Sequence, residues 1–270
     1  MKIDVFGDES DVNRTNAFLD KLLIHKVQVY QLSKNQTING ITYHAGKSYV
    51  VPTSQPQYRM VQSMFETYKE FTDSVYYDAS AWSLANFYNI PYGETSIVST
   101  GKEVKEIQSI NSVPERSKYA YIMPWTDYNA PAALYELQSA GIVLTSAFKP
   151  FANEAGSFGY GTVVIPVSRQ LVSEDSLYNT VKTVAGNWDV VIESVSTGYS
   201  KSGIDLGSGN LRVLQKPKAI MLVGEGVSSY EQGEVWHLLD TRVNMPITKL
   251  PIRNFNRVNL YNYNTMILVS

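Results

Sequence analysis

The chain has 270 residues, 44% hydrophobic and 18% charged, which is long enough for one to three domains with sizeable cores. Its net charge of −2, with neither sign in blocks, excludes the basic patch of a nucleic-acid-binding protein. The absence of cysteine excludes disulfides, thiolate metal sites and cysteine nucleophiles, and no apolar run approaches the ~20 residues of a membrane span.

The first predicted domain, 1–100, alternates strands with amphipathic helices. Its first helix carries Phe18, Leu19, Leu22 and Leu23 on one face, which is the spacing of a helix that packs on a sheet. In chain order the predicted elements are strand 2–6, helix 14–25, strand 27–32, strand 48–51 and helix 57–68.

The second predicted domain, 101–215, repeats this order at a period near 115 residues. Asn129 is expected to cap its first helix and Gly141 to close it, while Ser173 and Gly186 bound its second helix. The predicted elements are strand 119–123, helix 131–140, strand 142–147, strand 162–165, a helix after Ser173 and strand 189–195.

Strands that alternate with helices predict βαβ units in a largely parallel sheet, with helices on the sheet faces. The fold class is therefore α/β, with two similar three-layer βαβ-type lobes. Linkers are expected at 94–117 and 196–215, and Ile204 and Leu206 indicate that the second linker is packed.

The third predicted domain, 216–270, begins like a flavodoxin-like or amidotransferase-like sheet. Strand 218–223, a helix from 228 or 229 to 239, and strands 246–250 and 265–269 form an opening β-α-β-β segment. Such a sheet needs further layers, so we expect the segment to be the first part of a larger domain. Its exposed edge would pair with another chain, which predicts homo-oligomers or poor solubility.

Glu225 is the first candidate for contact with a ligand, because open α/β sheets bind ligands at the carboxyl ends of their strands. The turn 224–226 departs from the phosphate-binding pattern G-x-G-x-x-G, since residue 229 is serine. Glu234 and His237 are three residues apart on the following helix and form a conceivable acid–base pair, although a structural pair is more common. The three histidines lack metal-ligand spacing, so no metal site is predicted.

Two clusters of aromatic and acidic residues are further candidates for lining a cleft. Trp82 closes the run 76–82, and Trp125, Asp127 and Tyr128 follow a predicted strand. Their rings offer stacking surfaces and the carboxylate accepts hydrogen bonds. A helix cap beside a core aromatic residue is the favoured alternative for both clusters.

Five stretches of the chain, 46–66, 76–82, 121–137, 203–226 and 233–248, resemble one family in the same order. YIMPWTDYNAPAALYEL and GEVWHLLDTRVNMPIT are examples. They are similar to the C-terminal, non-peptidase region of large bacterial zinc carboxypeptidases of the carboxypeptidase A type. In that family a metallopeptidase domain precedes an α/β region and a class I glutamine amidotransferase-like domain.

The resemblance implies that this chain is an accessory region whose partner is the peptidase domain. The family's zinc ligands and catalytic glutamate belong to that domain and match no position here, so zinc is implied only for the absent domain. The amidotransferase chemistry requires a cysteine, and the chain has none. No catalytic residue is therefore predicted. The family is exported, periplasmic or extracellular, whereas early acidic residues leave no room for a signal peptide and the chain itself fixes no compartment.

Three functions follow, in decreasing order of preference. The first is a non-catalytic accessory region that scaffolds the peptidase domain or binds substrate. The second is a stand-alone two-lobed protein that binds a peptide or small polar ligand in a cleft lined by Trp82, Trp125, Tyr128 and Glu225. The third is a hydrolase that uses two of the carboxylates of Glu225, Glu234 and Asp127.

Overall fold

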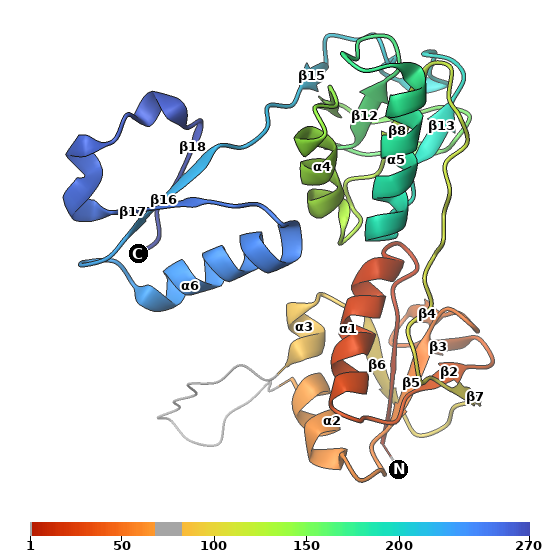
Figure 1. Cartoon of the computed structure of the whole chain (residues 1–270). Helices are drawn as coiled ribbons and strands as arrows, with labels where there is room; N and C mark the ends of the chain where they lie inside the picture. The colour runs from red at the N-terminus through yellow and green to blue at the C-terminus, as the bar shows by residue number, and fades with distance from the viewer. Residues whose placement is uncertain (1, 68–82) are drawn as a thin grey trace. The chain divides into compact units, whose positions relative to one another are not determined.

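The structure is a computed structural model that describes residues 2–67 and 83–270 (Figure 1). It has the expected α/β fold, with helices and several sheets in one chain. The chain divides into two compact units, Met1–Ile110 and Asn111–Ser270. The three predicted domains, with boundaries at 100 and 215, stay a prediction.

The first unit is built on a five-stranded antiparallel sheet with the strand order β6-β1-β5-β2-β7. The strands are β1 (Ile3–Phe6), β2 (Tyr30–Leu32), β5 (Tyr49–Pro52), β6 (Tyr92–Thr95) and β7 (Thr100–Glu103). The helices are α1 (Val12–Ile24), α2 (Tyr58–Phe65) and the short α3 (Leu84–Phe87). A separate hairpin joins β3 (Gln36–Ile38) to β4 (Ile41–Tyr43).

The second unit contains a sheet of the same design, with the strand order β13-β8-β12-β9-β15. Its strands are β8 (Ala120–Met123), β9 (Thr145–Ala147), β12 (Val163–Pro166), β13 (Glu193–Val195) and β15 (Leu211–Val213). Helices α4 (Ala130–Ser139) and α5 (Glu174–Trp188) connect them. A small sheet is formed by β10 (Phe151–Ala152), β11 (Ser157–Phe158) and β14 (Ser202–Gly203).

The prediction of largely parallel sheets is wrong for both repeats. In each one the first and second strands run parallel, but the third strand lies between them in the opposite direction. This arrangement is the split βαβ, or ferredoxin-like, topology. No helix lies between the second and third strands of either repeat, where a parallel sheet would have a helical crossover, so the order of elements already favoured an antiparallel third strand.

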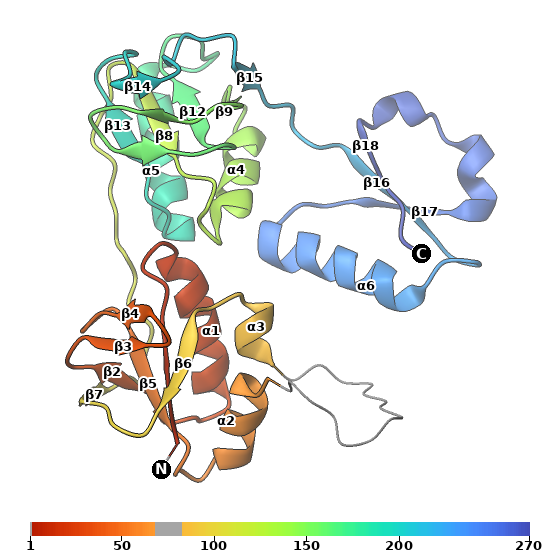
Figure 2. The ribbon, with the colours of Figure 1, turned by 180° about the vertical axis from the view of Figure 1, so that it is seen from behind.

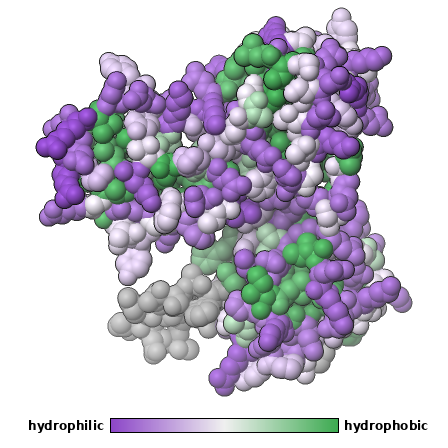
Figure 3. All heavy atoms as spheres, viewed as in Figure 1, coloured by the Kyte–Doolittle hydropathy of each residue, from purple (hydrophilic) through white to green (hydrophobic). Residues whose placement is uncertain are grey.

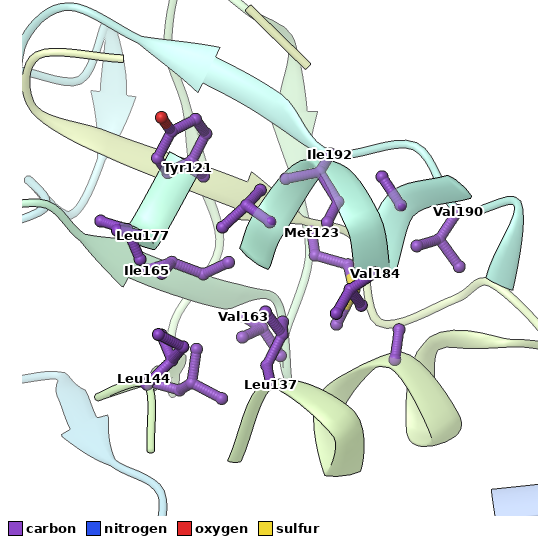
Figure 4. Close-up of a cluster of buried hydrophobic side chains, with 14 of the residues drawn as sticks. Tyr121, Met123, Leu137, Leu144, Val163, Ile165, Leu177, Val184, Val190 and Ile192 are labelled. Atoms are coloured by element: carbon purple, nitrogen blue, oxygen red, sulfur yellow. The ribbon is translucent and has the colours of Figure 1, made fainter. Parts of the chain in front are cut away.

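Helices cover only one face of each sheet, and a β layer covers the other (Figures 1 and 2). In the second unit, Tyr121 and Met123 of β8 point into the core beneath α4 and α5, shown in Figure 4. Ala120 and Ile122 of the same strand pack with Phe151 and the rest of the small sheet's core. Each repeat is thus three-layered, with a β layer as the third.

Two predicted helix ends are confirmed: the Ser173 hydroxyl caps α5, and Gly141 takes a φ of 77° after α4. Helix α1 begins two residues before the predicted start at 14, where the Asp11 side chain caps it. Gly186 does not end α5, which continues to Trp188. The left-handed position is taken instead by Asp189, with a φ of 53°, and an interior glycine costs a helix only about 1 kcal/mol.

The predicted linkers 94–117 and 196–215 each contain an edge strand, β7 and β15 respectively. All four residues of β7 are exposed, so the strand lacks the alternation of apolar and polar residues that reveals a half-buried strand. The prediction that 196–215 is packed is confirmed, because Ile204 and Leu206 pack against the core under the small sheet.

The last part of the second unit is a parallel three-stranded sheet, in the order β17-β16-β18. Its strands are β16 (Ala219–Val223), β17 (Thr248–Pro251) and β18 (Thr265–Ile267). Helix α6 (Ser229–His237) passes into a π-helical turn, Leu238–Arg242, and 3-10 turns span Ile252–Arg257 and Leu260–Asn262. None of the α6 residues is buried, and Figure 3 shows hydrophobic residues at the surface of this part.

Candidate functional site

The candidate site is a surface hollow at the carboxyl ends of β16 and β17. The chain leaves β16 through Val223, Gly224 and Glu225 and leaves β17 through Pro251, Ile252 and Arg253, and these residues line the hollow. Parallel strands bring their carboxyl ends to one edge, where open α/β sheets bind ligands.

Two glycines shape the turn on which Glu225 lies. Gly224 and Gly226 have φ values of 103° and 86°, a region that side-chain-bearing residues rarely adopt. No atom lies within 4 Å of where a Cβ would stand on either glycine, so the turn faces open space. The exposed Glu225 side chain is therefore presented to solvent at the rim of the hollow.

Glu225 and Arg253 bring opposite charges to the lining. Both side chains are exposed, and neither makes a hydrogen bond or ion pair to any residue within 2–67 or 83–270. Two free groups of opposite charge can contact a ligand that itself carries both charges. No second acid or base lines the hollow beside Glu225 in the part of the chain that the structure describes, so the arrangement favours binding over proton transfer.

The start of α6 is occupied by the residue Ser270. The Ser228 hydroxyl accepts from the Glu231 N–H at 3.4 Å, and the Ser228 N–H donates to the Ser270 carbonyl at 2.7 Å. The hydroxyl and the N–H of Ser270 both donate to the Glu231 carboxylate, and these bonds lower the pKa of Glu231. Within the described residues, the N–H groups of Ser228 and Glu231 at this helix start thus already have acceptors.

Glu234 and His237 lie on the exposed surface of α6, one turn apart. Their side chains form no hydrogen bond to each other. The neighbouring Trp236 is held by Lys249 of β17, whose Nζ lies 3.7 Å from the centre of the indole ring. The local contacts of this helix are therefore structural, through stacking of a cation on an aromatic ring.

Trp125, Asp127 and Tyr128 lie together in the loop between β8 and α4. The Asp127 carboxylate accepts from the Asn129 N–H at 2.7 Å, as in the turns that precede many helices. The Trp125 side chain packs on Gly161, where a Cβ would come within 2.8 Å of the ring. The Asp127 carboxylate thus holds a turn ahead of α4, and the Trp125 ring, 39% exposed, covers Gly161.

Tyr128 and Asn129 make further contacts within the second unit. The Arg242 guanidinium lies 4.0 Å from the centre of the Tyr128 ring. Asn129 is at the predicted cap position of α4, but its side-chain amide donates to the Trp188 carbonyl at 2.8 Å instead of capping the helix. Trp82, the remaining predicted cleft residue, lies outside the described residues.

Sequence reasoning missed Arg253. Open α/β sheets bind ligands at the carboxyl ends of their strands, and this rule, which identified Glu225 after β16, applies equally to Arg253, two residues after β17 ends at Pro251. It was missed because the predicted strand ended at 250 and the residues after it carried no recognised motif.

The described residues offer no group of side chains that could bind zinc. Within 2–67 and 83–270, no three His, Asp or Glu side chains come close enough together to hold a metal ion. In the same residues, no helix combines the length and the apolarity needed to cross a bilayer.

Comparison with known proteins yields no family. No family model matches the sequence, and no curated protein matches it.

Proposed function

We propose that this chain is a non-catalytic accessory region of a zinc metallocarboxypeptidase-like protein. The support is the ordered series of stretches that resemble such proteins, from residues 46–66 to 233–248. Its role is to scaffold the peptidase domain or to hold part of the substrate.

The arrangement of the carboxylates carries the non-catalytic part of the proposal. Glu225 stands at a binding hollow, Glu234 and His237 lie on an exposed helix, and Asp127 accepts a backbone hydrogen bond in a turn. Carboxylate-based hydrolysis needs two carboxyl groups that flank one bond. The Glu225–Arg253 pair instead supports contact with a peptide or a small polar ligand that carries both charges.

Exposed apolar side chains support the scaffolding role. Tyr230 of α6 is 84% exposed and Leu268, after β18, is 68% exposed. A folded α/β layer normally covers such residues with a further layer. The peptidase domain of the parent protein is the partner that the resemblance supplies.

Zinc stoichiometry and peptidase activity of the purified chain test the proposal. Equilibrium dialysis against zinc, followed by elemental analysis, should find less than stoichiometric metal, and release of C-terminal amino acids from peptides should stay at the buffer rate. Stoichiometric zinc, or hydrolysis that chelators abolish, would contradict the proposal.

A stand-alone ligand-binding protein is the second candidate, favoured by the hollow at the sheet edge. Thermal unfolding with sugars, dipeptides and nucleotides tests it, because a ligand that binds the folded state raises the stability. A dipeptide that stabilises the chain, with the effect lost in Arg253→Gln, would support this candidate. The absence of a shift with every ligand would reject it.

A further inference from the structure

A second hollow lies in the repeat that contains β8, and it shares no lining residue with the candidate site. Its volume is about 130 Å³, which is below the ~300–1,000 Å³ of drug-sized ligand sites and leaves room for a small molecule only. Its floor is the sheet face opposite the helices, where Ala120 and Val164 are buried. Tyr119, Leu206 and Leu211 form its walls.

The first repeat shows why this hollow exists. Register places Ile3 opposite Pro52 and Ala120 opposite Pro166, so Ile3 and Ala120 are equivalent positions. Tyr30 and Thr145 are equivalent in the same way, because each lies opposite the matching valine of the next strand. At these two positions the first repeat has the large side chains of Ile3 and Tyr30. The second repeat has the small side chains of Ala120 and Thr145, which leaves the hollow.

The walls of the hollow are held in place before any ligand arrives. The Leu206 N–H donates to the Gly198 carbonyl at 2.9 Å, and the Ser200 N–H donates to the Asp205 carboxylate at 2.8 Å. Tyr119 packs so closely on Gly198 that a Cβ there would meet its hydroxyl at 2.2 Å. A preformed wall lowers the ordering cost of binding.

One cation stands at the hollow. Arg169 is the one charged residue of the described lining, and its exposed side chain has no partner within 2–67 or 83–270. The adjacent Gln170 fixes its backbone: the side chain accepts from the Val143 N–H at 2.8 Å and donates to the carbonyls of Val143 and Pro166. The guanidinium of Arg169 can bind a carboxylate while the apolar floor beside it contacts the apolar part of the same ligand.

We propose that this hollow binds a small organic carboxylate, with its apolar body on Ala120 and Thr145 and its carboxylate on Arg169. The site is independent of the proposed function and lies outside the Glu225 hollow. Arg169 supplies charge-assisted hydrogen bonds, and the floor supplies burial of apolar surface.

Phenylacetate is the test ligand, and its binding to the whole chain is measured from the changes in NMR amide chemical shifts during a titration. We expect saturable shifts at Thr145, Val164 and Leu211, with a Kd of the order of 1 mM for a ligand of this size. Phenylacetamide, which lacks the charge, should bind about tenfold more weakly, and inorganic phosphate should give no saturable shift at these residues.

Three variants complete the test. Arg169→Gln should weaken binding by about tenfold, while Lys182→Gln, a charge change on the exposed surface of α5, should leave it unchanged. Thr145→Tyr combined with Ala120→Ile inserts the first repeat's own side chains and should abolish binding. If that double variant does not fold, as judged by circular dichroism, the Arg169→Gln result decides alone. Shifts that map elsewhere, equal binding of the amide or of phosphate, or full binding by Arg169→Gln would overturn the proposal.

Discussion

Replacing Asp4 with asparagine should remove a pH-dependent loss of stability from the first unit. Asp4 lies in the centre of β1 and is 2% exposed, and its Oδ2 has no hydrogen-bond partner among the described residues. Burial raises the pKa of its carboxyl to about 6; nearby Lys2 acts in the opposite direction and Glu94 adds to the rise. The equivalent position in the second repeat is Tyr121, whose hydroxyl accepts from the Ser117 N–H.

The magnitude follows from linkage between protonation and folding. Between the ordinary value of 3.8 and about 6 the folded state binds more protons than the unfolded state, so stability falls as the pH rises through this window. A shift of this size corresponds to about 3 kcal/mol, present below the window and lost above it. Asparagine carries no titratable proton, so the variant should lack this loss.

Native-state hydrogen exchange measures the effect within the first unit. The amides of Leu19 and Leu22 in α1 report its stability, and comparison of variant and parent at one pH cancels the intrinsic exchange rates. The stability of the parent relative to Asp4→Asn should fall by about 2 kcal/mol from pH 4 to pH 7, because at pH 4 the unfolded carboxyl is already more than half ionised. Asp20→Asn, at an exposed position of α1, is the matched control and should show no such trend. A difference between the parent and Asp4→Asn that stays constant over this range would show that the Asp4 carboxyl does not lose a proton in this pH window.

Three further predictions concern packing and assembly. Phe18→Ala removes a fully buried ring of the first core and should cost about 3–5 kcal/mol, measured by urea unfolding; a loss below 1 kcal/mol would contradict the observed packing. Gln170→Ala removes three side-chain hydrogen bonds to the backbone and should lower the free energy of unfolding by about 1–3 kcal/mol, with faster hydrogen exchange at the Val143 amide. Unchanged exchange at Val143 would show that these hydrogen bonds are not needed to hold this part of the backbone. Among the residues that the structure describes, β17 and β18 each pair only with β16, so light scattering should show association that grows with concentration, and a monomer at all concentrations would disprove it.

The sequence predicts the main helices and the central strands of each repeat, because burial on one face imposes a clear period. It misses β6, which overlaps the predicted linker 94–117, and the short strands of the hairpin and the small sheet. The helix with Phe18, Leu19 and Leu22 and the strands that end at Pro52 and Pro166 were all located from local residues. The direction of the third strand was not predicted, although the absence of a helix between the second and third strands of each repeat favours an antiparallel strand. The position of β5 and β12 between two earlier strands depends on tertiary packing and leaves no local pattern.

The candidate sites divide in the same way. Glu225 could be located because a glycine turn after a buried strand is a local signal. The hollow above Ala120 and Thr145 could not, since it arises from a difference in side-chain size between two repeats whose register only the structure provides. Arg169 carries no motif, and its place at the hollow depends on the contacts of Gln170.

Sequencing the gene on both sides of this segment would show whether the chain is an accessory region of a larger protein. An accessory region predicts an upstream metallopeptidase domain with the H-x-x-E zinc motif and a downstream α/β continuation that covers the third sheet. A start codon at Met1 and a stop codon after Ser270 would contradict that account and would move the stand-alone ligand-binding protein to first place.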